Sequence, residues 1–229
     1  MNIQGYQKVT LLDFPGRVAC TVFTGGCNLR CPFCHNAGLV REPSAHPNAE
    51  AEVLDYLAKR RGILDGICLT GGEPLLHPDV TDFIANVKAM GFAVKLDTNG
   101  SLPARLSAVL DTGLVDYVAM DVKSSPDGYK KAIGCGMDFA PFAESMAVIQ
   151  SSGVDFEFRT TAVKGIHTME DFEVIAAMIG DKPYFVQKFT DSGHLLSTGW
   201  APFTDDEMHA ILRAVRVHTP RAALRGCQG

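Results

Sequence analysis

Residues 18–36 read VACTVFTGGCNLRCPFCHN and join a short apolar run to a glycine-rich loop with three cysteines. The β-branched and apolar residues of Val18–Phe23 predict a buried strand. In the loop, Cys27, Cys31 and Cys34 follow a C-x3-C-x2-C spacing, which lets one stretch of chain wrap three thiolates around a compact iron–sulfur cluster. Three thiolates on four irons leave one iron open, as a reactive metal site requires.

Two other metal or redox sites use cysteines in similar patterns. A zinc knuckle would take the three thiols together with His35. His35 directly follows Cys34, however, which makes simultaneous ligation awkward. A ferredoxin-like electron carrier would need a fourth cysteine nearby, and the sequence lacks it. The spacing therefore favours a cluster with an open iron.

Four further cysteines lie outside this loop. Cys20 and Cys68 fall within apolar runs, where we expect small core residues. Cys135 and Cys227 fall in expected loops, as ordinary free thiols or as redox partners. An odd total of seven cysteines, without the pattern of a signal peptide at the N-terminus, indicates a reducing compartment. We expect a cytoplasmic protein.

Length and charge narrow the class of protein. A chain of 229 residues suits one substantial core, so we expect a single domain over residues 1–229. Residues 1–17 would be an N-terminal lead-in, and residues 203–229 a C-terminal helix and tail. The net charge of −5 offers no basic surface for nucleic acid. No apolar run approaches the ~20 residues that span a bilayer, so neither nucleic acid nor a membrane is an expected partner.

Strand-like runs alternate with stretches of helical periodicity. Six strands are expected, at Val18–Phe23, Gly66–Leu69, Ala93–Asp97, Tyr117–Asp121, Phe156–Thr161 and Tyr184–Phe189. Three amphipathic helices are the clearest, with apolar faces at Val80, Phe83, Ile84 and Val87; at Phe172, Ile175, Ala176 and Ile179; and at Met208, Ile211, Leu212 and Val215, the last capped by Thr204. This alternation predicts parallel βαβ units. Six units are too few to close an eight-stranded barrel, so the predicted fold is α/β, an open partial (β/α)6 TIM-like barrel.

Polar or glycine-rich clusters follow five of the expected strands. Because the carboxyl ends of parallel strands meet at one edge of the sheet, these clusters should converge there on a single site. They are the cysteine loop, Thr70-Gly71-Gly72-Glu73, Asp97-Thr98-Asn99-Gly100, Asp121-Val122-Lys123 and Arg159.

The combined motifs resemble the radical S-adenosylmethionine (SAM) superfamily over nearly the whole chain. The resemblance is carried by the C-x3-C-x2-C loop, the aromatic Phe33 before its last cysteine, and Gly71-Gly72-Glu73-Pro74 after the second strand. It implies a 4Fe–4S cluster held by Cys27, Cys31 and Cys34, with SAM bound at the open iron. One electron would cleave SAM to a 5′-deoxyadenosyl radical, which removes hydrogen from a substrate.

The same resemblance implies roles for the residues around the cofactor. Phe33 would lie near the adenine, and Gly71, Gly72 and Glu73 match the motif that hydrogen-bonds the cofactor's amino group. Asp97, Asp121 and Lys123 match the D-T-N-G and D-x-K motifs of glycyl-radical-enzyme activases, where a monovalent cation joins them in some members. Arg159 matches the strand arginine at the cofactor's polar end. No side chain is expected to act as a catalytic acid or base.

Each of these motifs also has a simpler interpretation. The Gly-Gly-Glu-Pro segment could be only a turn, and Asp97-Thr98-Asn99-Gly100 a helix-capping turn. Asp121 and Lys123 could be a solvated ion pair. Arg159 could pair with any carboxylate at the rim of the sheet.

The N-terminal stretch points to a class of substrate. Val9–Arg17, running into the cysteine loop, is similar to activating proteins of anaerobic ribonucleoside-triphosphate reductase. That branch implies hydrogen removal from a glycine of the reductase, with flavodoxin or ferredoxin as electron donor. Where pyruvate formate-lyase activases carry a histidine after the last strand, this chain has Gln187-Lys188-Phe189-Thr190, and a cofactor role for the later His194 is in doubt.

Three alternatives to this substrate assignment stay open. The chain could activate another glycyl radical enzyme. It could act on a small molecule, as a 7-deazaguanine-type synthase does. From a different class, it could be a non-enzymatic zinc or iron–sulfur binding module. The short barrel carries no second cysteine cluster and no added domain to cover its mouth, which favours a protein substrate that excludes water itself.

Overall fold

The computed structural model describes residues 1–41, 44, 46, 48–191 and 193–227. Strands and helices alternate along most of it, as the periodicity predicts. The strands are β1 (Ile3–Thr10), β2 (Ala19–Thr24), β3 (Gly66–Gly71), β4 (Ala93–Thr98), β5 (Tyr117–Asp121), β6 (Asp155–Lys164), β7 (Tyr184–Lys188), β8 (Ala201–Pro202) and β9 (Ala223–Arg225). The helices are α1 (Ala37–Arg41), α2 (Ala49–Ala58), the 3-10 turn η1 (Pro74–Leu76), α3 (Val80–Ala89), α4 (Pro103–Leu110), α5 (Tyr129–Ile133), α6 (Ala140–Ser151), α7 (Met169–Ile179) and α8 (Asp205–Val215).

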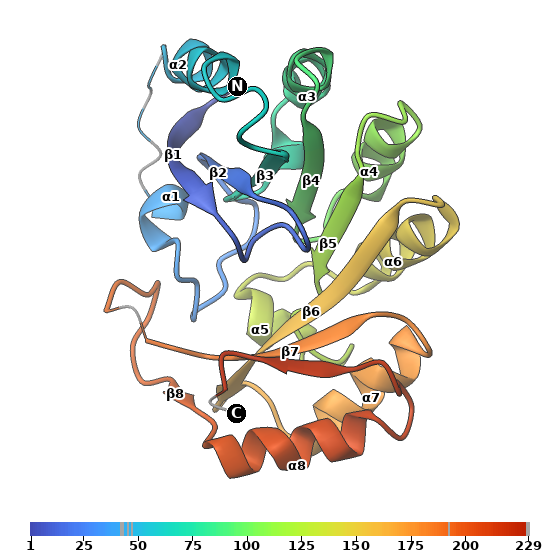
Figure 1. The fold of residues 1–229 in the computed structure, drawn as a ribbon. Coiled ribbons are helices and arrows are strands. Elements are labelled where there is room, and N and C mark those ends of the chain that lie inside the picture. The colour runs from blue at the N-terminus through green and yellow to red at the C-terminus, as the bar shows by residue number, and fades with distance from the viewer. Residues whose placement is uncertain (42–43, 45, 47, 192, 228–229) are drawn as a thin grey trace.

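The sheet is a parallel barrel that does not close. Strands β2 to β7 pair as parallel neighbours in chain order, and they correspond to the six strands predicted from sequence. The full path runs β1-β2-β3-β4-β5-β6-β7-β9, so β1 and β9 stand at its two ends. Helices α2, α3, α4, α6, α7 and α8 lie around the outside of the curved sheet (Figure 1). The predicted open (β/α)6 architecture is confirmed.

The two end strands were not predicted. Residues 3–10, expected to be only a lead-in, form β1, which runs antiparallel to β2. Only Ile3 and Thr10 at its ends are buried, so the strand lacks the strict alternation that reveals a half-buried strand in sequence. The other end strand, β9, has three residues, too few for a periodic signal, and pairs with β7.

The amphipathic helices bury the faces that periodicity predicts. The predicted residues of α3 and α7 are all buried, whereas in α8 Leu212 is half-buried and the other three are buried. Thr204 caps α8 as expected, accepting a hydrogen bond from the Glu207 backbone N–H while Glu207 reaches back to the Thr204 N–H. Within the described residues, no helix has the length and apolar character needed to cross a membrane.

The loop between β1 and β2 closes the end of the barrel where the parallel strands begin. Phe14 is 2% exposed and packs beside Tyr117, with ring centroids 6.0 Å apart. The Asp13 carboxylate accepts a hydrogen bond from the Thr21 hydroxyl, and the Asp13 backbone carbonyl accepts one from the buried Lys95. The Val9–Arg17 stretch therefore builds the floor of the barrel, at the end opposite the cysteine loop.

Candidate active site

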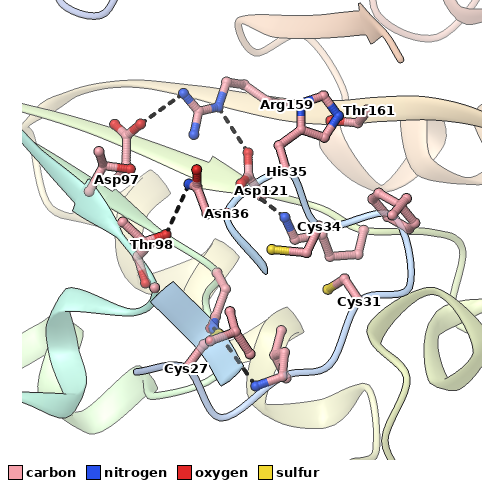
Figure 2. A pocket seen from close by; sticks show the side chains of 18 of the residues that line it. Cys27, Cys31, Cys34, His35, Asn36, Asp97, Thr98, Asp121, Arg159 and Thr161 are labelled. Carbon is pink, nitrogen blue, oxygen red and sulfur yellow. Dashed lines mark hydrogen bonds and ion pairs between the residues drawn. The ribbon is translucent and has the colours of Figure 1, made fainter. Parts of the chain in front are cut away.

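A cavity of about 320 Å³ opens where the parallel strands end. The three cysteines of the loop after β2 line it together with the glycine turn after β3 and charged side chains from β4, β5 and β6 (Figure 2). The convergence expected for the carboxyl edge of a parallel sheet is therefore present. Of the predicted site residues, all but Glu73 line this cavity: Cys27, Cys31, Phe33, Cys34, Gly71, Gly72, Asp97, Asp121, Lys123 and Arg159.

The cysteine loop is held by a hydrogen bond within itself and by one to helix α5. The Leu29 N–H donates to the Cys27 Sγ at 3.4 Å, and the Arg30 N–H donates to the Ile133 carbonyl of α5 at 2.8 Å. Burial raises the pKa of Cys31 to about 12, and it also raises that of Cys27. The protein alone thus keeps these thiols protonated, and a bound metal must displace their protons.

The three thiols do not share a single-ion site. Among the described residues, no group of three or more His, Cys, Asp or Glu could hold one metal ion together. A zinc knuckle with His35 needs such a group, because all its ligands bind one ion. His35 is instead exposed at the cavity, its ring edge-on to Phe189 with centroids 5.4 Å apart. The three cysteines nevertheless line one cavity of about 320 Å³.

The glycine turn after β3 lies directly against the cysteine loop. The Glu73 N–H donates to the Gly26 carbonyl at 2.9 Å, and a Cβ atom on Gly72 would collide with that same carbonyl oxygen. Gly71 has φ of +116°, a conformation that L side chains rarely adopt. Both glycines are therefore required by geometry, and they bring backbone amides to the cavity wall beside Cys27.

Glu73 serves the site from behind its wall. The residue is fully buried and does not line the cavity. Its carboxylate accepts hydrogen bonds from the Leu75 N–H, the Thr98 hydroxyl and the Asn99 N–H, at 3.1, 2.9 and 2.7 Å. Glu73 thus ties the turn after β3 to the Asp-Thr-Asn-Gly turn after β4. Burial raises the pKa of Glu73 to about 7, against the lowering effect of these donors.

Four charged side chains form one network on the opposite wall. The Arg159 guanidinium bridges two carboxylates, with Nη1 3.0 Å from Asp97 Oδ2 and Nε 2.9 Å from Asp121 Oδ1. The Lys123 ammonium lies 3.0 Å from Asp121 Oδ2. Figure 2 shows Arg159 between the two carboxylates. The strand alternation of β4, β5 and β6 accounts for this meeting, because Asp121 and Arg159 are direct register partners.

The network keeps Asp121 and Lys123 ionised. Burial alone would raise the pKa of Asp121, but Arg159 and Lys123 hold it well below its usual range. Burial would likewise lower the pKa of Lys123, and the Asp121 carboxylate raises it above its usual value. The cavity therefore presents fixed charges of both signs, which suits a ligand that carries both.

Phe33 packs against a histidine that sequence patterns did not single out. His167 is 5% exposed, and its ring lies edge-on to Phe33 with centroids 6.3 Å apart. Its Nδ1 accepts from the Val163 N–H, so Nε2 carries the proton and donates to the Lys123 carbonyl at 2.7 Å. His167 thus orders both an aromatic wall of the cavity and the backbone of Lys123.

Ten other residues line the cavity without an individual role assigned from sequence, although Thr70, Thr98 and Asn99 belong to the predicted clusters. They are Leu29, His35, Asn36, Val40, Thr70, Thr98, Asn99, Thr161, Gln187 and Lys188. Leu29, His35, Asn36 and Asn99 follow a motif cysteine or a strand end by one or two positions, and Thr70, Thr98, Gln187 and Lys188 are among the last two residues of their strands. These positions are the signal that could have found them. Asn99 also points its amide at Cys27, with Nδ2 3.7 Å from Sγ.

The remaining cysteines are placed as the sequence suggested. Cys20 and Cys68 are 0% and 1% exposed in the core, and Cys135 and Cys227 are half-buried free thiols. None of these four lines the cavity, and neither does His194.

The donor set of the cavity fits a cluster together with SAM. Three thiols line the space, and beside them Gly71 and Gly72 place backbone without side chains at its wall. On the opposite wall, carboxylates suit the amino and sulfonium charges of SAM, and the cationic side chains suit its carboxylate.

Comparisons with known proteins agree with this fit. A family profile described as the radical SAM superfamily matches residues 21–179, more than half of the chain. A Methanocaldococcus jannaschii protein named for glycyl-radical enzyme activation is 33% identical, over 82% of this chain and 79% of its own. A 7-carboxy-7-deazaguanine synthase of Methanopyrus kandleri is 29% identical over 87% and 82%. The pyruvate formate-lyase-activating enzyme of Clostridium pasteurianum is 30% identical over 64% and 65%.

Solved structures share the fold. A radical SAM methyltransferase from Sphaerobacter thermophilus matches 96% of this chain and 69% of its own, with a TM-score of 0.72 and 15% identity. Streptococcus suis SuiB bound to S-adenosylmethionine matches 89% of this chain with a TM-score of 0.68 and 16% identity. The chain spans about half the length of SuiB, 49%.

Proposed function

Because this chain belongs to the radical SAM superfamily, whose members use a 4Fe–4S cluster and S-adenosylmethionine, we propose that it is an oxidoreductase that activates a glycyl radical enzyme. Its protein substrate would be anaerobic ribonucleoside-triphosphate reductase. The observation that carries the proposal is the meeting of three thiols, the glycine turn and four opposed charges in one cavity at the carboxyl edge of the sheet.

The chain's own residues would bind and orient, without a side-chain acid or base. Cys27, Cys31 and Cys34 would hold the cluster. Gly71 and Gly72 would present backbone groups to the amino group of SAM, with Glu73 fixing their turn from behind. A cluster held there would supply the single electron needed to cleave SAM into methionine and a 5′-deoxyadenosyl radical, which would take one hydrogen atom from a glycine.

The charged wall would hold the methionine part of SAM. Asp97 and Asp121 would face its positive groups, while Lys123 and Arg159 would face its carboxylate. Arg159 already links the two carboxylates in this structure, so its guanidinium supplies positive charge between them. Phe33, ordered by His167, would pack near the adenine.

Two relatives support a protein as the substrate: one is named for glycyl-radical enzyme activation and the other for pyruvate formate-lyase activation. The reductase in particular is supported by the Val9–Arg17 stretch and by Gln187-Lys188-Phe189-Thr190, which departs from the pyruvate formate-lyase activases. We further propose residues 1–229 as one cytoplasmic domain that receives its electron from flavodoxin or ferredoxin.

A second candidate function has a specific observation behind it. The Methanopyrus kandleri relative named 7-carboxy-7-deazaguanine synthase covers slightly more of this chain than the relative named for glycyl-radical activation. The same cavity residues would then bind SAM beside a small pterin-like substrate. The test below therefore includes both kinds of substrate, the protein and the pterin.

The test is electron paramagnetic resonance of the anaerobically reconstituted, reduced protein with SAM and the host's anaerobic ribonucleotide reductase. We expect a glycine-centred doublet that requires all components, and no 5′-deoxyadenosine from Cys27→Ala, Cys31→Ala or Cys34→Ala. Cys20→Ala, a buried thiol outside the cavity, serves as the matched control and should retain both signals.

Other outcomes separate the alternatives. 5′-Deoxyadenosine without a glycyl signal would move the substrate to another glycyl radical enzyme, or to a pterin if turnover appears when one is added. One equivalent of zinc with no sulfide would show a metal-binding module and contradict the proposal.

A further inference from the structure

Seven charged side chains of alternating sign form a continuous row from the C-terminal strand to the cavity. Four of them are the cavity network, and the row continues below it through Lys95 and Glu157 to Arg225 of β9. Successive charged groups are separated as follows: Arg225 to Glu157 2.7 Å, Glu157 to Lys95 3.7 Å, Lys95 to Asp97 3.5 Å, Asp97 to Arg159 3.0 Å, Arg159 to Asp121 2.9 Å, and Asp121 to Lys123 3.0 Å.

Lys95 is the third member of this row and lies beneath the cavity, where it joins Glu157 to Asp97. It lies two residues before Asp97 on β4, so both side chains point to the same face of the sheet. The Lys95 side chain is 1% exposed and does not line the cavity. Its ammonium donates to the Asp13 carbonyl at 2.5 Å and lies 5.5 Å from the centre of the Tyr117 ring. The loop between β1 and β2 (residues 11–18, the floor loop) therefore holds Lys95 from the side opposite Asp97.

Asp97 depends on this lysine because of how its two oxygens are placed. Oδ2 accepts a hydrogen bond from Arg159 at the cavity wall. Oδ1 is buried and receives no hydrogen bond among the described residues, and the Lys95 ammonium lies 3.5 Å from it. An uncompensated buried charge is strongly unfavourable. Without Lys95, Asp97 would keep only Arg159 as its balancing charge.

Glu157, on the other side of Lys95, has partners of its own. Glu157 is fully buried. Each of its two carboxylate oxygens accepts a hydrogen bond from one terminal nitrogen of Arg225 at 2.7 Å, and Oε2 also accepts one from the Tyr117 hydroxyl at 3.0 Å. Removing the Lys95 charge leaves these bonds in place. The main effect of such a change should therefore fall on Asp97 and, through it, on Arg159.

We propose that Lys95 is a positioning residue for cofactor binding, which holds the Asp97 carboxylate and hence the Arg159 guanidinium in the arrangement that receives SAM. This inference rests on the proposed function, since it takes the cavity to be the SAM site. It assigns a functional task to a side chain that reaches neither the cavity nor the cluster.

The test is a double-mutant cycle on SAM affinity. The dissociation constant of SAM is measured by equilibrium dialysis on reconstituted protein whose iron and sulfide contents match the wild type. Lys95→Met and Asp97→Asn should each weaken binding about tenfold, the effect of about 1.4 kcal/mol. The double variant should bind no more weakly than Asp97→Asn alone, because Lys95 acts through Asp97.

Two further variants keep the result interpretable. Lys88→Met removes another lysine paired with a carboxylate, Asp116 at 2.8 Å, outside the cavity, and it should leave SAM affinity unchanged. If Lys95→Met does not fold, Lys95→Gln takes its place in the cycle, because its amide can still donate to the Asp13 carbonyl.

The outcomes separate this inference from the proposed function. Wild-type protein that carries its cluster but binds no SAM would overturn both. Wild-type binding with an unchanged dissociation constant in the Lys95 variants, or with losses that simply add in the double variant, would overturn the role of Lys95 alone.

Discussion

At the scale of single residues, Glu73 shows that a motif residue can serve a site without facing it. Its carboxylate is completely buried and meets three donors but no cationic side chain within hydrogen-bonding distance among the described residues. Desolvation therefore dominates, and the pKa rises to about 7 from an ordinary 4.5. The folded state holds this proton more tightly than the unfolded state does.

That difference predicts a pH dependence of stability. As pH rises from 4.5 to 7, the unfolded chain releases the Glu73 proton first, so the free energy of unfolding falls across this window. A shift of this size corresponds to about 3 kcal/mol. Glu73→Gln has no proton to lose there. The difference in free energy of unfolding between the wild type and Glu73→Gln should therefore fall by about 3 kcal/mol between pH 4.5 and pH 8. Urea unfolding of both proteins, run in parallel under anaerobic conditions, measures this difference.

Parallel curves for the two proteins would show that the folded and unfolded pKa values of Glu73 coincide. A wild-type advantage that grows with pH would mean that the donors outweigh desolvation. Either result would contradict the electrostatic account of this turn.

Residues of the site were predictable from sequence where a motif meets a strand end. Cys27 follows β2, Asp97 lies near the end of β4 and Arg159 lies within β6, and the geometry of parallel sheets brings such positions together. Lys95 and His167 could not be found in this way. Their tasks depend on which atoms lie beneath or behind the cavity wall, and this is set by tertiary packing that no local pattern records.

At the scale of elements, the site depends on how closely two loops approach. The turn after β3 and the cysteine loop after β2 touch through the backbone at Gly72 and Gly26, and no side chain fits between them. Neighbouring parallel strands place their following loops side by side, so this contact is a direct consequence of the β2–β3 register.

Gly72→Ala should therefore separate the two loops. Its added methyl group would collide with the Gly26 carbonyl, and overpacking of this kind costs about 1–3 kcal/mol. Because Gly26 directly precedes Cys27, the iron bound per chain should fall as well. Gly38→Ala, an exposed position of α1 with nothing near its added Cβ, is the matched control and should be neutral or slightly stabilising. Normal iron content in Gly72→Ala would show that the loops can part without harm.

Elements were predictable in proportion to their length and the regularity of their burial. The six central strands were found from sequence to within a few residues at their ends, and the apolar faces of helices α3, α7 and α8 were found as well. β1 escaped because only its two end residues are fully buried, and β9 because three residues carry no period. Both lie at the ends of the sheet, where burial on one side weakens the pattern.

At the scale of the whole molecule, the open barrel has two ends with different tasks. The carboxyl end holds the cavity, while the other end is closed by Phe14 and the floor loop. The row of charges through Lys95 joins the two ends inside the barrel. Its last member, Arg225, also fastens the final strand of the sheet to the interior through Glu157.

Arg225→Met should test how much this internal tie contributes to stability. The substitution leaves the fully buried Glu157 without its bidentate partner, and breaking a buried pair in this way costs about 3–5 kcal/mol. Lys95 and Tyr117 remain near Glu157, so we expect the lower end, about 3 kcal/mol at neutral pH. Lys59→Met breaks an exposed pair with Asp55 and should cost less than about 1 kcal/mol.

The pKa of Glu157 determines how the stability cost of Arg225→Met changes with pH. Burial would raise the pKa of Glu157, but Arg225 and Lys95 hold it below its ordinary 4.5. The ionised Glu157 carboxylate therefore contributes its full stabilisation above pH 4.5. This contribution is lost as the pH falls through the pKa of Glu157 in the folded state, which is lower than in the unfolded chain. The penalty of Arg225→Met should accordingly be full at pH 7 and shrink in acid, where a protonated Glu157 no longer needs a cation. A penalty that stays constant from pH 7 to pH 3 would mean that Arg225 stabilises the last strand by packing on Phe185, whose ring centre lies 3.6 Å away, and not by its charge.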